Sequence, residues 1–462
     1  MKGYSIVISK LTPQINGSYL QKLFRMKPAQ IIILSFVLMI SIGTFFLMLP
    51  ISTTNNRGLE FFDALFVATS ASCVTGLTVV DVRNDLTIFG TIVMLLLIQI
   101  GGLGIMTLAT LVVHKMGYRF RLKENVVLQE SLNQGTQAGL VTLIRKIIKY
   151  TLVIEGFFAA LLAIHFVPEF GWKSVGYGIF HSVSAFCNAG FDLFGNYDSL
   201  CKRADDLFLL TCLGSLILLG NTGFTVISDV INRRKWKKFS LHTKIVLVMN
   251  FALVVIGGAV IFAVEQFNPY TLEGLPLSEQ IAQSVFTSIS CRTAGMNTFI
   301  LDEAEQITLL TMILLMFIGA APLSTGGGIK LTTFFVVLMS MWAVFRGKSE
   351  IVVFGRRISE KIRNQAFAIF TMGTLWVVTA GMILSAIDGE VHQLGAVIFE
   401  TVSGFATVGM GIGITSDWNS WGKVILSLTM LVGRVGIMTF MVSLITQRED
   451  RIKYPPEDIM IG

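Results

Sequence analysis

The stretch ETVSGFATVGMGIG, residues 400–413, lies between two long apolar runs near the end of the chain and is rich in glycine. In hydrocarbon an unpaired peptide group is costly, so non-helical backbone at membrane depth survives only where it is buried in protein or lines a watery cavity. If the neighbouring runs cross a membrane, this stretch therefore predicts a buried or pore-lining loop.

The same pattern occurs at four places in the chain. Three other segments align with residues 399–409 over eleven positions without a gap, and all four windows end in glycine. The final glycines are 114, 105 and 114 residues apart, and a near-constant period indicates a repeated structural unit. The windows are FVATSASCVTG (66–76), FHSVSAFCNAG (180–190), VFTSISCRTAG (285–295) and FETVSGFATVG (399–409).

The composition is that of a polytopic membrane protein, because 53% of the 462 residues are hydrophobic, 14% are charged and the mean hydropathy is +0.71. Each window follows one long apolar run and a short helix-like piece, and precedes another long run. We therefore predict an all-α integral membrane protein with four span–pore-helix–span repeats and eight transmembrane helices. The apolar runs are residues 31–49, 89–113, 147–167, 207–230, 245–264, 307–341, 367–387 and 424–445.

The basic residues alternate from side to side along the chain. Of the 36 lysines and arginines, 27 lie in residues 1–28, 114–149, 231–244, 346–363 and 448–454, so the positive-inside rule predicts that both termini are cytoplasmic. The formal charge of +7 needs no nucleic acid partner, because basic loops beside anionic membrane lipids account for it. The predicted parts are a cytoplasmic leader (1–28), four pore repeats (29–115, 146–231, 242–345 and 365–446) and a cytoplasmic tail (447–462).

Four equivalent loops can close a ring with pseudo-four-fold symmetry around one pore. Carbonyls can point at a common axis only if some residues take positive φ, as glycine does, and their oxygens can then replace the water shell of a cation. The short helices direct their partially negative C-terminal ends to the same place. The alternative is that the glycines only allow close helix packing. The predicted cation-binding residues are Val74, Thr75, Gly76, Asn188, Ala189, Gly190, Thr293, Ala294, Gly295, Thr407, Val408 and Gly409.

This four-part pattern, together with STGGGIK (324–330) and GRVGIMT (433–439), resembles the membrane subunit of the bacterial Ktr and Trk potassium uptake systems, within the Ktr/Trk/HKT superfamily and closest to the Ktr subunit. The resemblance covers about residues 30–446. It implies a plasma-membrane protein with one pore per chain, a homodimer, and a cytoplasmic ring of nucleotide-binding regulatory subunits similar to KtrA or TrkA.

The resemblance also bears on the ion. Some plant relatives with serine in the first loop favour sodium, whereas all four loops here end in glycine, which favours potassium as the permeant ion. Sodium as an activating or coupled ion stays open, and no cofactor is expected. A sodium- or proton-coupled secondary transporter is the alternative, but such proteins usually combine midplane ionisable groups with inverted repeats. An enzyme is not expected, because the sequence contains no recognisable catalytic or metal-binding set.

Two charged residues lie beside the predicted filter. An unpaired Arg292 guanidinium would oppose cation entry, so we predict that it points behind its loop and pairs with Glu400. The alternative is that Arg292 reaches the outer surface.

The run 307–341 is too long for a plain span, because its 35 residues would make a helix of about 52 Å against a hydrocarbon core of about 30 Å. Pro322 and three consecutive glycines predict an intramembrane loop at 319–330, below the filter, that gates the pore. The alternative is a kinked helix with Lys330 extended to the cytoplasmic face. The predicted gate residues are Gly319, Ala320, Ala321, Pro322, Leu323, Ser324, Thr325, Gly326, Gly327, Gly328, Lys330 and Arg434.

Other patterns carry less information. STGGGIK lacks the order of a phosphate-binding loop. The basic run RRKWKK (233–238) indicates a membrane-flanking loop or a docking surface for the regulator. The five cysteines have no metal-ligand spacing and are expected to be small buried residues.

Overall fold

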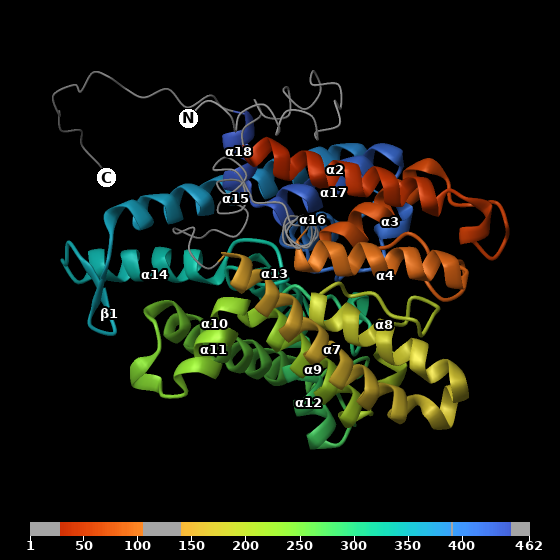
Figure 1. Cartoon of the computed structure of the whole chain (residues 1–462), viewed down its shortest axis with the longest axis horizontal. Helices are drawn as coiled ribbons and strands as arrows, with labels where there is room; N and C mark the ends of the chain where they lie inside the picture. The colour runs from red at the N-terminus through yellow and green to blue at the C-terminus, as the bar shows by residue number, and fades with distance from the viewer. Residues whose placement is uncertain (1–27, 105–139, 390, 445–462) are drawn as a thin grey trace, which may run out of the picture.

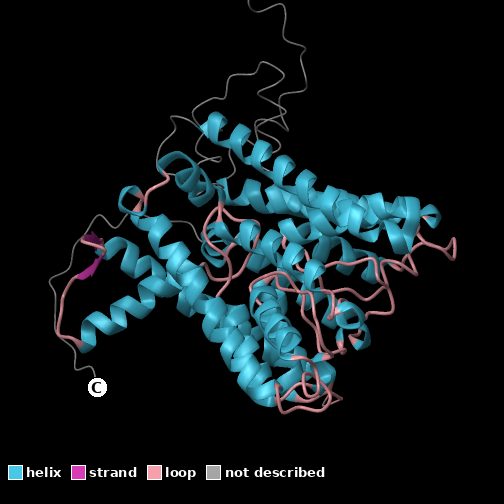
Figure 2. Cartoon of the chain, turned by 90° about the horizontal axis from the view of Figure 1, so that it is seen from below, coloured by secondary structure: helices cyan, strands magenta, loops and turns pink. Residues whose placement is uncertain are grey.

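The computed structural model describes residues 28–104, 140–389 and 391–444, and this part of the chain is a bundle of α-helices with one two-stranded hairpin (Figures 1 and 2). All of the predicted leader except residue 28, most of the basic stretch 114–149 and the predicted tail lie outside the described residues. The α-helices are α2 (Pro28–Leu47), α3 (Phe61–Cys73), α4 (Ile88–Leu103), α7 (Leu140–Phe170), α8 (Ser174–Cys187), α9 (Leu207–Thr222), α10 (Phe224–Arg233), α11 (Leu241–Glu265), α12 (Leu277–Ser290), α13 (Gln306–Phe317), α14 (Leu331–Phe345), α15 (Glu360–Asp388), α16 (Leu394–Ala406), α17 (Ser420–Val435) and α18 (Ile437–Leu444).

Short elements connect these helices. The strands β1 (Ile351–Val353) and β2 (Arg356–Ile358) pair antiparallel between α14 and α15, with Val352 opposite Arg357. The 3-10 turns are η2 (Pro50–Ser52), η3 (Gly171–Lys173), η4 (Cys201–Arg203), η5 (Trp236–Lys238), η6 (Leu301–Glu303) and η7 (Thr415–Asp417).

Four of the described helical segments are long and apolar enough to cross a membrane, and they contain α2, α7, α11 and α15. These helices overlap the predicted runs that precede the four windows. Each is followed by one of the short helices α3, α8, α12 and α16, which ends just before its glycine loop. The alternation of a long helix with a short one is what the sequence predicts.

Two of the runs that follow the windows, 207–230 and 424–445, are not continuous helices, which the sequence pattern does not predict. The chain bends by 94° between α9 and α10 and by 101° between α17 and α18. The bends lie at Gly223 (φ 86°) and Gly436 (φ 92°), in a left-handed region that glycine enters at little steric cost. α4 likewise stops before Gly104 (φ 83°), beyond which the structure is not described.

The third of these runs is interrupted as predicted. α13 ends at Phe317, α14 begins at Leu331, and no residue from 318 to 330 is helical. The kinked-helix alternative does not fit this segment. Gly328 (φ 70°) has the same left-handed backbone as its sequence counterparts Gly104, Gly223 and Gly436.

Polar caps fix where three of these helices begin. Thr87, Asp206 and Asn419 each accept a hydrogen bond from the backbone N–H three residues later, at the N-termini of α4, α9 and α17. Such caps satisfy N–H groups that the first helical turn leaves unpaired. The helices that follow the first, second and fourth glycine loops therefore begin at defined residues.

The helices are packed in a closed cycle. The helix after each loop contacts the short helix of the next unit, as in the pairs α4 with α8, α9 with α12 and α13 with α16, and α17 from the last unit contacts α3 from the first. In Figure 1, α2 and α3 near the N-terminus accordingly lie beside α17. Phe66, Phe180 and Phe399, which open three of the windows, are at most 2% exposed.

The cysteines are free thiols, as expected, and Cys73, Cys187, Cys212 and Cys291 are buried whereas Cys201 is half-buried.

Candidate functional site

The four glycine loops share one backbone course. Two residues before each final glycine, a residue other than glycine takes left-handed φ: Val74 (59°), Asn188 (61°), Thr293 (74°) and Thr407 (52°). This conformation costs a non-glycine residue about 1–2 kcal/mol, and it persists where the surrounding structure imposes it, which is frequent at functional sites. The glycines themselves have φ values of 103°, 74°, 76° and 94° in chain order.

The four glycines follow one another around a closed ring. A Cβ atom added to Gly76 would lie 2.6 Å from the Ala189 oxygen, and one added to Gly190 would lie 2.6 Å from the Ala294 oxygen. A Cβ on Gly295 would overlap the oxygen of the residue before Gly409, and one on Gly409 would overlap the oxygen of the residue before Gly76. Each loop therefore lies against a carbonyl of the next one, with room for a hydrogen atom only. Glycine is required here for space as well as for φ.

Serines of the short helices hold the loops. The Ser70 hydroxyl accepts from Gly76 N–H at 3.0 Å, and the Ser403 hydroxyl accepts from Gly409 N–H at 3.1 Å. In the third unit the Ser290 hydroxyl accepts from Met296 N–H at 2.8 Å. In the second unit the corresponding serine donates to a loop carbonyl, Phe191 O, at 2.6 Å. Our sequence reasoning missed these residues, although a serine recurs at the fifth or sixth position of every window.

The third short helix ends differently from the others. α3, α8 and α16 end three residues before their final glycine, whereas α12 ends at Ser290, five residues before Gly295. Arg292 and Cys291 occupy the extra turn, and Thr293 still adopts the left-handed backbone. The left-handed backbone two residues before the glycine is thus kept although α12 ends earlier relative to its glycine than the other three helices do.

A cavity of about 310 Å³ lies on one side of the ring and is lined by all four final glycines. Asp81, Asp192, Asn297 and Ser416 also line it, so polar and acidic groups surround the approach to the ring. The Asp81 carboxylate accepts from the backbone N–H groups of Arg83 (2.9 Å) and Asn84 (3.1 Å), and these bonds fix its position.

Arg292 and Glu400 do not pair, which corrects the prediction. The fully buried Arg292 guanidinium donates to the backbone oxygen and to the side-chain oxygen of Asn250 in α11, with Nη1 at 3.2 Å from the backbone oxygen. Glu400 accepts from Thr415 Oγ1 at 2.6 Å and from Trp418 Nε1 at 2.9 Å. Arg292 is also 0% exposed, so the alternative of a surface arginine is wrong as well.

The physical reason is that the two side chains are directed to different partners. Asn250 offers the arginine two oxygens on the adjacent long helix, so both terminal nitrogens of the buried guanidinium are hydrogen-bonded without a second charge, while its Nε has no hydrogen-bond partner among the described residues. The signal for this partner was a single asparagine inside the apolar run 245–264.

We expect Arg292 and Asn250 to be energetically coupled. Arg292→Met and Asn250→Leu should each destabilise the protein, and the double variant should show a coupling energy of about 2 kcal/mol, as for a buried hydrogen bond to a charged group. Thermal or denaturant unfolding in detergent measures this cycle. Additive effects for this pair, or equal coupling of Arg292 with Glu400, would contradict the assignment.

The loop between α13 and α14 lies directly against the four-loop ring. Thr325 Oγ1 donates to Phe186 O at 3.0 Å, at the end of α8, and Gly327 N–H donates to the Thr407 hydroxyl at 3.0 Å. A Cβ on Gly326 would overlap the Thr293 hydroxyl. The ends of the loop are joined, because Gly319 N–H donates to Ile329 O at 2.9 Å. The predicted gate segment therefore touches three of the four units.

Lys330 and Arg434 both bind backbone carbonyls of this region. Lys330 Nζ donates to Gly326 O at 2.7 Å, so its side chain folds back on its own loop and is not extended towards the helix end. Arg434 donates to Thr325 O in the loop and to Gly101 O and Gly102 O (3.1 Å) at the end of α4. Arg434 thereby links the loop to the first unit, which the sequence could not reveal.

A family model described as TrkH, cation transport protein, matches residues 4–452. The chain belongs to the TrkH family. This TrkH-family member is therefore a transport protein and not an enzyme, and the resemblance inferred from the four windows is confirmed.

Individual proteins are similar to it over almost their whole length. Ktr system potassium uptake protein B of Bacillus subtilis (strain 168) is 40% identical over 442 residues, covering 96% of this chain and 98% of the relative. The potassium/sodium uptake protein NtpJ of Enterococcus hirae is 37% identical over 444 residues, covering 95% and 98%. The crystal structure of the potassium transporter TrkH from Vibrio parahaemolyticus has the same fold, with a TM-score of 0.71, 19% identity, and coverage of 90% of this chain and 84% of that chain.

Proposed function

We propose that this TrkH-family member takes up potassium across the plasma membrane through a channel-like pore whose selectivity filter is the ring of four loops. The observation that carries the proposal is the closed contact of the four final glycines, each against a carbonyl of the next loop. Carbonyl oxygens in a ring replace the hydration shell of a cation without a fixed charge. Three of the filter positions, Val74, Thr293 and Thr407, hold a β-branched residue in left-handed backbone, which supports a site under functional constraint.

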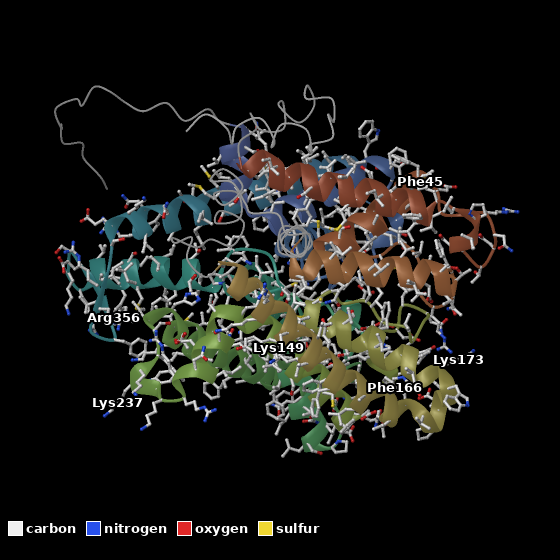
Figure 3. The ribbon with its side chains drawn as sticks, in the orientation of Figure 1. Phe45, Lys149, Phe166, Lys173, Lys237 and Arg356 are labelled. Atoms are coloured by element: carbon white, nitrogen blue, oxygen red, sulfur yellow. The ribbon has the colours of Figure 1, made fainter. Side chains whose placement is uncertain are left out.

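The proposal includes eight spans arranged with pseudo-four-fold symmetry, in the four repeats predicted from the sequence. The cyclic packing of α4 on α8, α9 on α12, α13 on α16 and α17 on α3 supports this arrangement. Both termini are proposed to be cytoplasmic. In support, Lys237 and Arg356, from two basic connections, lie at one end of the molecule, and Phe45 and Lys173 lie at the other (Figure 3).

Potassium is the proposed permeant ion because a glycine ends all four loops and leaves the ring free of side chains at these positions. Relatives named for potassium uptake and for potassium/sodium uptake are both similar over nearly the full length. Sodium is accordingly proposed as an activating ion, and sodium coupling belongs to the second candidate function considered below.

The loop 319–330 is proposed as the gate. It lies against filter residues of the third and fourth units, and small polar residues let it move without exposing a large apolar surface. Arg434 holds it to α4 in the described conformation, and Lys330 adds a second positive charge. Both positive side chains would repel a permeant cation.

The proposed assembly is a homodimer with a cytoplasmic ring of nucleotide-binding regulatory subunits. Two basic connections that are far apart in sequence meet at the surface available to such a ring. The Trp236 and Phe354 rings are in edge contact at 6.4 Å, and Lys244 Nζ lies 5.7 Å from the Phe354 centroid.

Reversing the charge of this surface should uncouple the regulator. In a variant with Arg233, Arg234 and Lys235 all changed to glutamate, we expect nucleotide-dependent stimulation of uptake to fall by about tenfold or more, because the rim charges that attract an acidic partner are inverted. Basal uptake by the membrane subunit alone should persist. Flux assays with and without the regulator separate the two effects, and loss of folding would show that the run determines topology instead.

Rubidium or potassium uptake by the purified protein in liposomes tests the function directly. Uptake without a sodium gradient, blocked little by sodium, is the expected result. Uptake that requires a sodium or proton gradient would favour the second candidate, a coupled secondary cation transporter, for which the named potassium/sodium relative is the supporting observation. No cation flux under either condition would reject the proposal.

A further inference from the structure

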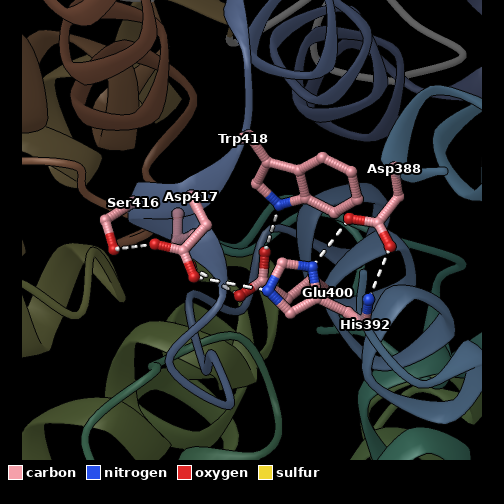
Figure 4. Close-up of polar contacts among 7 residues, drawn as sticks. Asp388, His392, Glu400, Ser416, Asp417 and Trp418 are labelled. Atoms are coloured by element: carbon pink, nitrogen blue, oxygen red, sulfur yellow. Dashed lines mark hydrogen bonds and ion pairs between the residues drawn. The ribbon is translucent and has the colours of Figure 1, made fainter. Parts of the chain in front are cut away.

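A histidine lies between two carboxylates beside the fourth loop (Figure 4). His392 Nδ1 is 2.7 Å from Asp388 Oδ1, and the His392 backbone N–H donates to Asp388 Oδ2 at 2.8 Å. His392 Nε2 is 3.3 Å from Asp417 Oδ2. Asp388 ends α15 and Asp417 belongs to η7, so the imidazole joins two segments that are separate in sequence.

The geometry defines the charge state of this imidazole. An ionised carboxylate only accepts hydrogen bonds, and a neutral imidazole carries one N–H, so only the imidazolium satisfies both contacts. The two carboxylates accordingly raise the pKa of His392 above its ordinary value, Asp388 through the largest effect and Asp417 through a smaller one. Among the described residues, the charged or titratable groups that face His392 are Asp388 from α15, Asp417 from η7 and Glu400 from α16.

The segment that Asp417 belongs to is also held from the inside. Glu400, which is 0% exposed, accepts hydrogen bonds from Thr415, the first residue of η7, and from Trp418, the residue that follows η7. A Cβ on Gly411 would lie 3.2 Å from Glu400 Oε1. The chain from the ring glycine Gly409 to Trp418 is thus packed on a buried carboxylate, with His392 as its outer contact.

A second histidine shows the contrast. His181 in α8 lies beside the second loop, where Nδ1 is 2.8 Å from Tyr177 O and Nε2 accepts from Leu193 N–H at 3.3 Å. A carbonyl only accepts and an N–H only donates, so this arrangement requires the neutral tautomer. A histidine thus packs beside the second loop and another beside the fourth. Of these two, only His392, beside the fourth loop, must be protonated to make its contacts.

We propose that the His392 imidazolium positions the outer part of the fourth loop and makes the ion selectivity of uptake sensitive to the pH of the outer medium. This inference rests on the proposed function and topology. The histidine touches no permeant ion, and acts through Asp417 and the neighbouring Thr415 and Trp418.

The direction of the effect follows from the geometry and charge. Because the folded-state pKa is raised, the contribution of the imidazolium is fully present below the ordinary pKa of histidine and is lost as the pH rises through the raised value. Asp388 is 6% exposed at its side chain and Asp417 is 59% exposed. On deprotonation the remaining proton stays on Nδ1, where it faces the Asp388 carboxylate. The contact from Nε2 to Asp417 is the one lost.

The test measures rubidium uptake and its inhibition by sodium in liposomes as the outer pH is raised from about 5.5 to about 8.5, across the range in which histidine titrates. We expect the preference for rubidium to fall by about threefold, the scale of a partly exposed ion pair. His392→Gln should show the high-pH selectivity at every pH, and Asp417→Asn should flatten the profile. His165→Gln is the matched control, because His165 pairs with Asp206 away from the fourth loop.

A His392→Gln protein that keeps the wild-type pH profile, or an active wild type whose selectivity does not change with pH, would overturn the inference. Absence of uptake at every pH would instead reject the proposed function. In that case the titration of His392, followed by NMR of labelled imidazole, still decides the inference. Asp417→Asn is expected to lower the His392 pKa, and an unchanged value would overturn the assigned contact.

Discussion

Replacing Gly76 with serine is expected to reduce the preference for potassium over sodium by about tenfold or more, a change of about 1.4 kcal/mol in relative ion affinity. A side chain at this position would meet the Ala189 oxygen at 2.6 Å, at a φ of 103° that serine rarely adopts. The collision is with backbone of the next loop, so the carbonyl must move and the ring must widen or tilt. A wider or more polar ring suits potassium less well.

Gly274→Ser is the matched control for this change. Gly274, between α11 and α12, also has left-handed φ, at 80°, but a Cβ there would meet no atom within 4 Å. Both substitutions carry backbone strain, and only the one in the ring carries a collision. Competition between sodium and rubidium for uptake should therefore change for Gly76→Ser and stay close to wild type for Gly274→Ser. Equal relative affinities in wild type and Gly76→Ser would count against the filter assignment.

Removing the Arg434 side chain is expected to raise potassium flux by about tenfold. Its guanidinium holds the 319–330 loop to the end of α4 through Thr325 O, Gly101 O and Gly102 O. Hydrogen bonds from a charged donor contribute about 1.5–3 kcal/mol each, so losing several of them favours displacement of the loop. Arg434→Ala also removes a positive charge from the constriction. Deleting residues 324–328 should raise flux in the same way and make it less dependent on the regulator.

Stopped-flow or tracer flux in liposomes measures these variants, with Arg57→Ala as a control for the loss of an exposed arginine. Each variant must remain monodisperse and keep its selectivity, so that a leak through a damaged filter is not counted as gating. Flux that falls or stays unchanged in a folded, selective protein would reject the gate and leave the loop as a structural interruption.

The features that could be predicted from the sequence are those that depend on a short run of neighbouring residues. The four windows predicted the short helices and the glycine loops, and Pro322 with its following glycines predicted the break between α13 and α14. The role of glycine could be predicted at these positions because it depends on the conformation of the residue's own backbone and not on contacts with distant residues. The same reasoning could have found the bends at Gly223 and Gly436, which align with Gly328, but their apolar surroundings suggested continuous helices.

The hydrogen-bond partners of buried polar side chains could not be predicted from short stretches of sequence. Arg292 binds Asn250 and Arg434 binds carbonyls at the end of α4, and both contacts depend on how distant helices pack. Charge alone suggested Glu400 as the partner of Arg292. In the structure the two groups have separate partners: Arg292 binds neutral oxygens of Asn250, and Glu400 accepts from Thr415 and Trp418. A buried arginine seeks oxygen atoms in the right geometry, and these need not belong to a carboxylate.

The central claim is that the four loops form one cation-binding ring, and anomalous diffraction from crystals soaked in thallium, which substitutes for potassium, tests it most directly. We expect an anomalous peak on the axis between Gly76, Gly190, Gly295 and Gly409, lost on exchange into sodium and weakened in Gly76→Ser. Thallium bound only at the acidic residues of the outer cavity, or absent from the ring of a protein that still transports rubidium, would contradict the account.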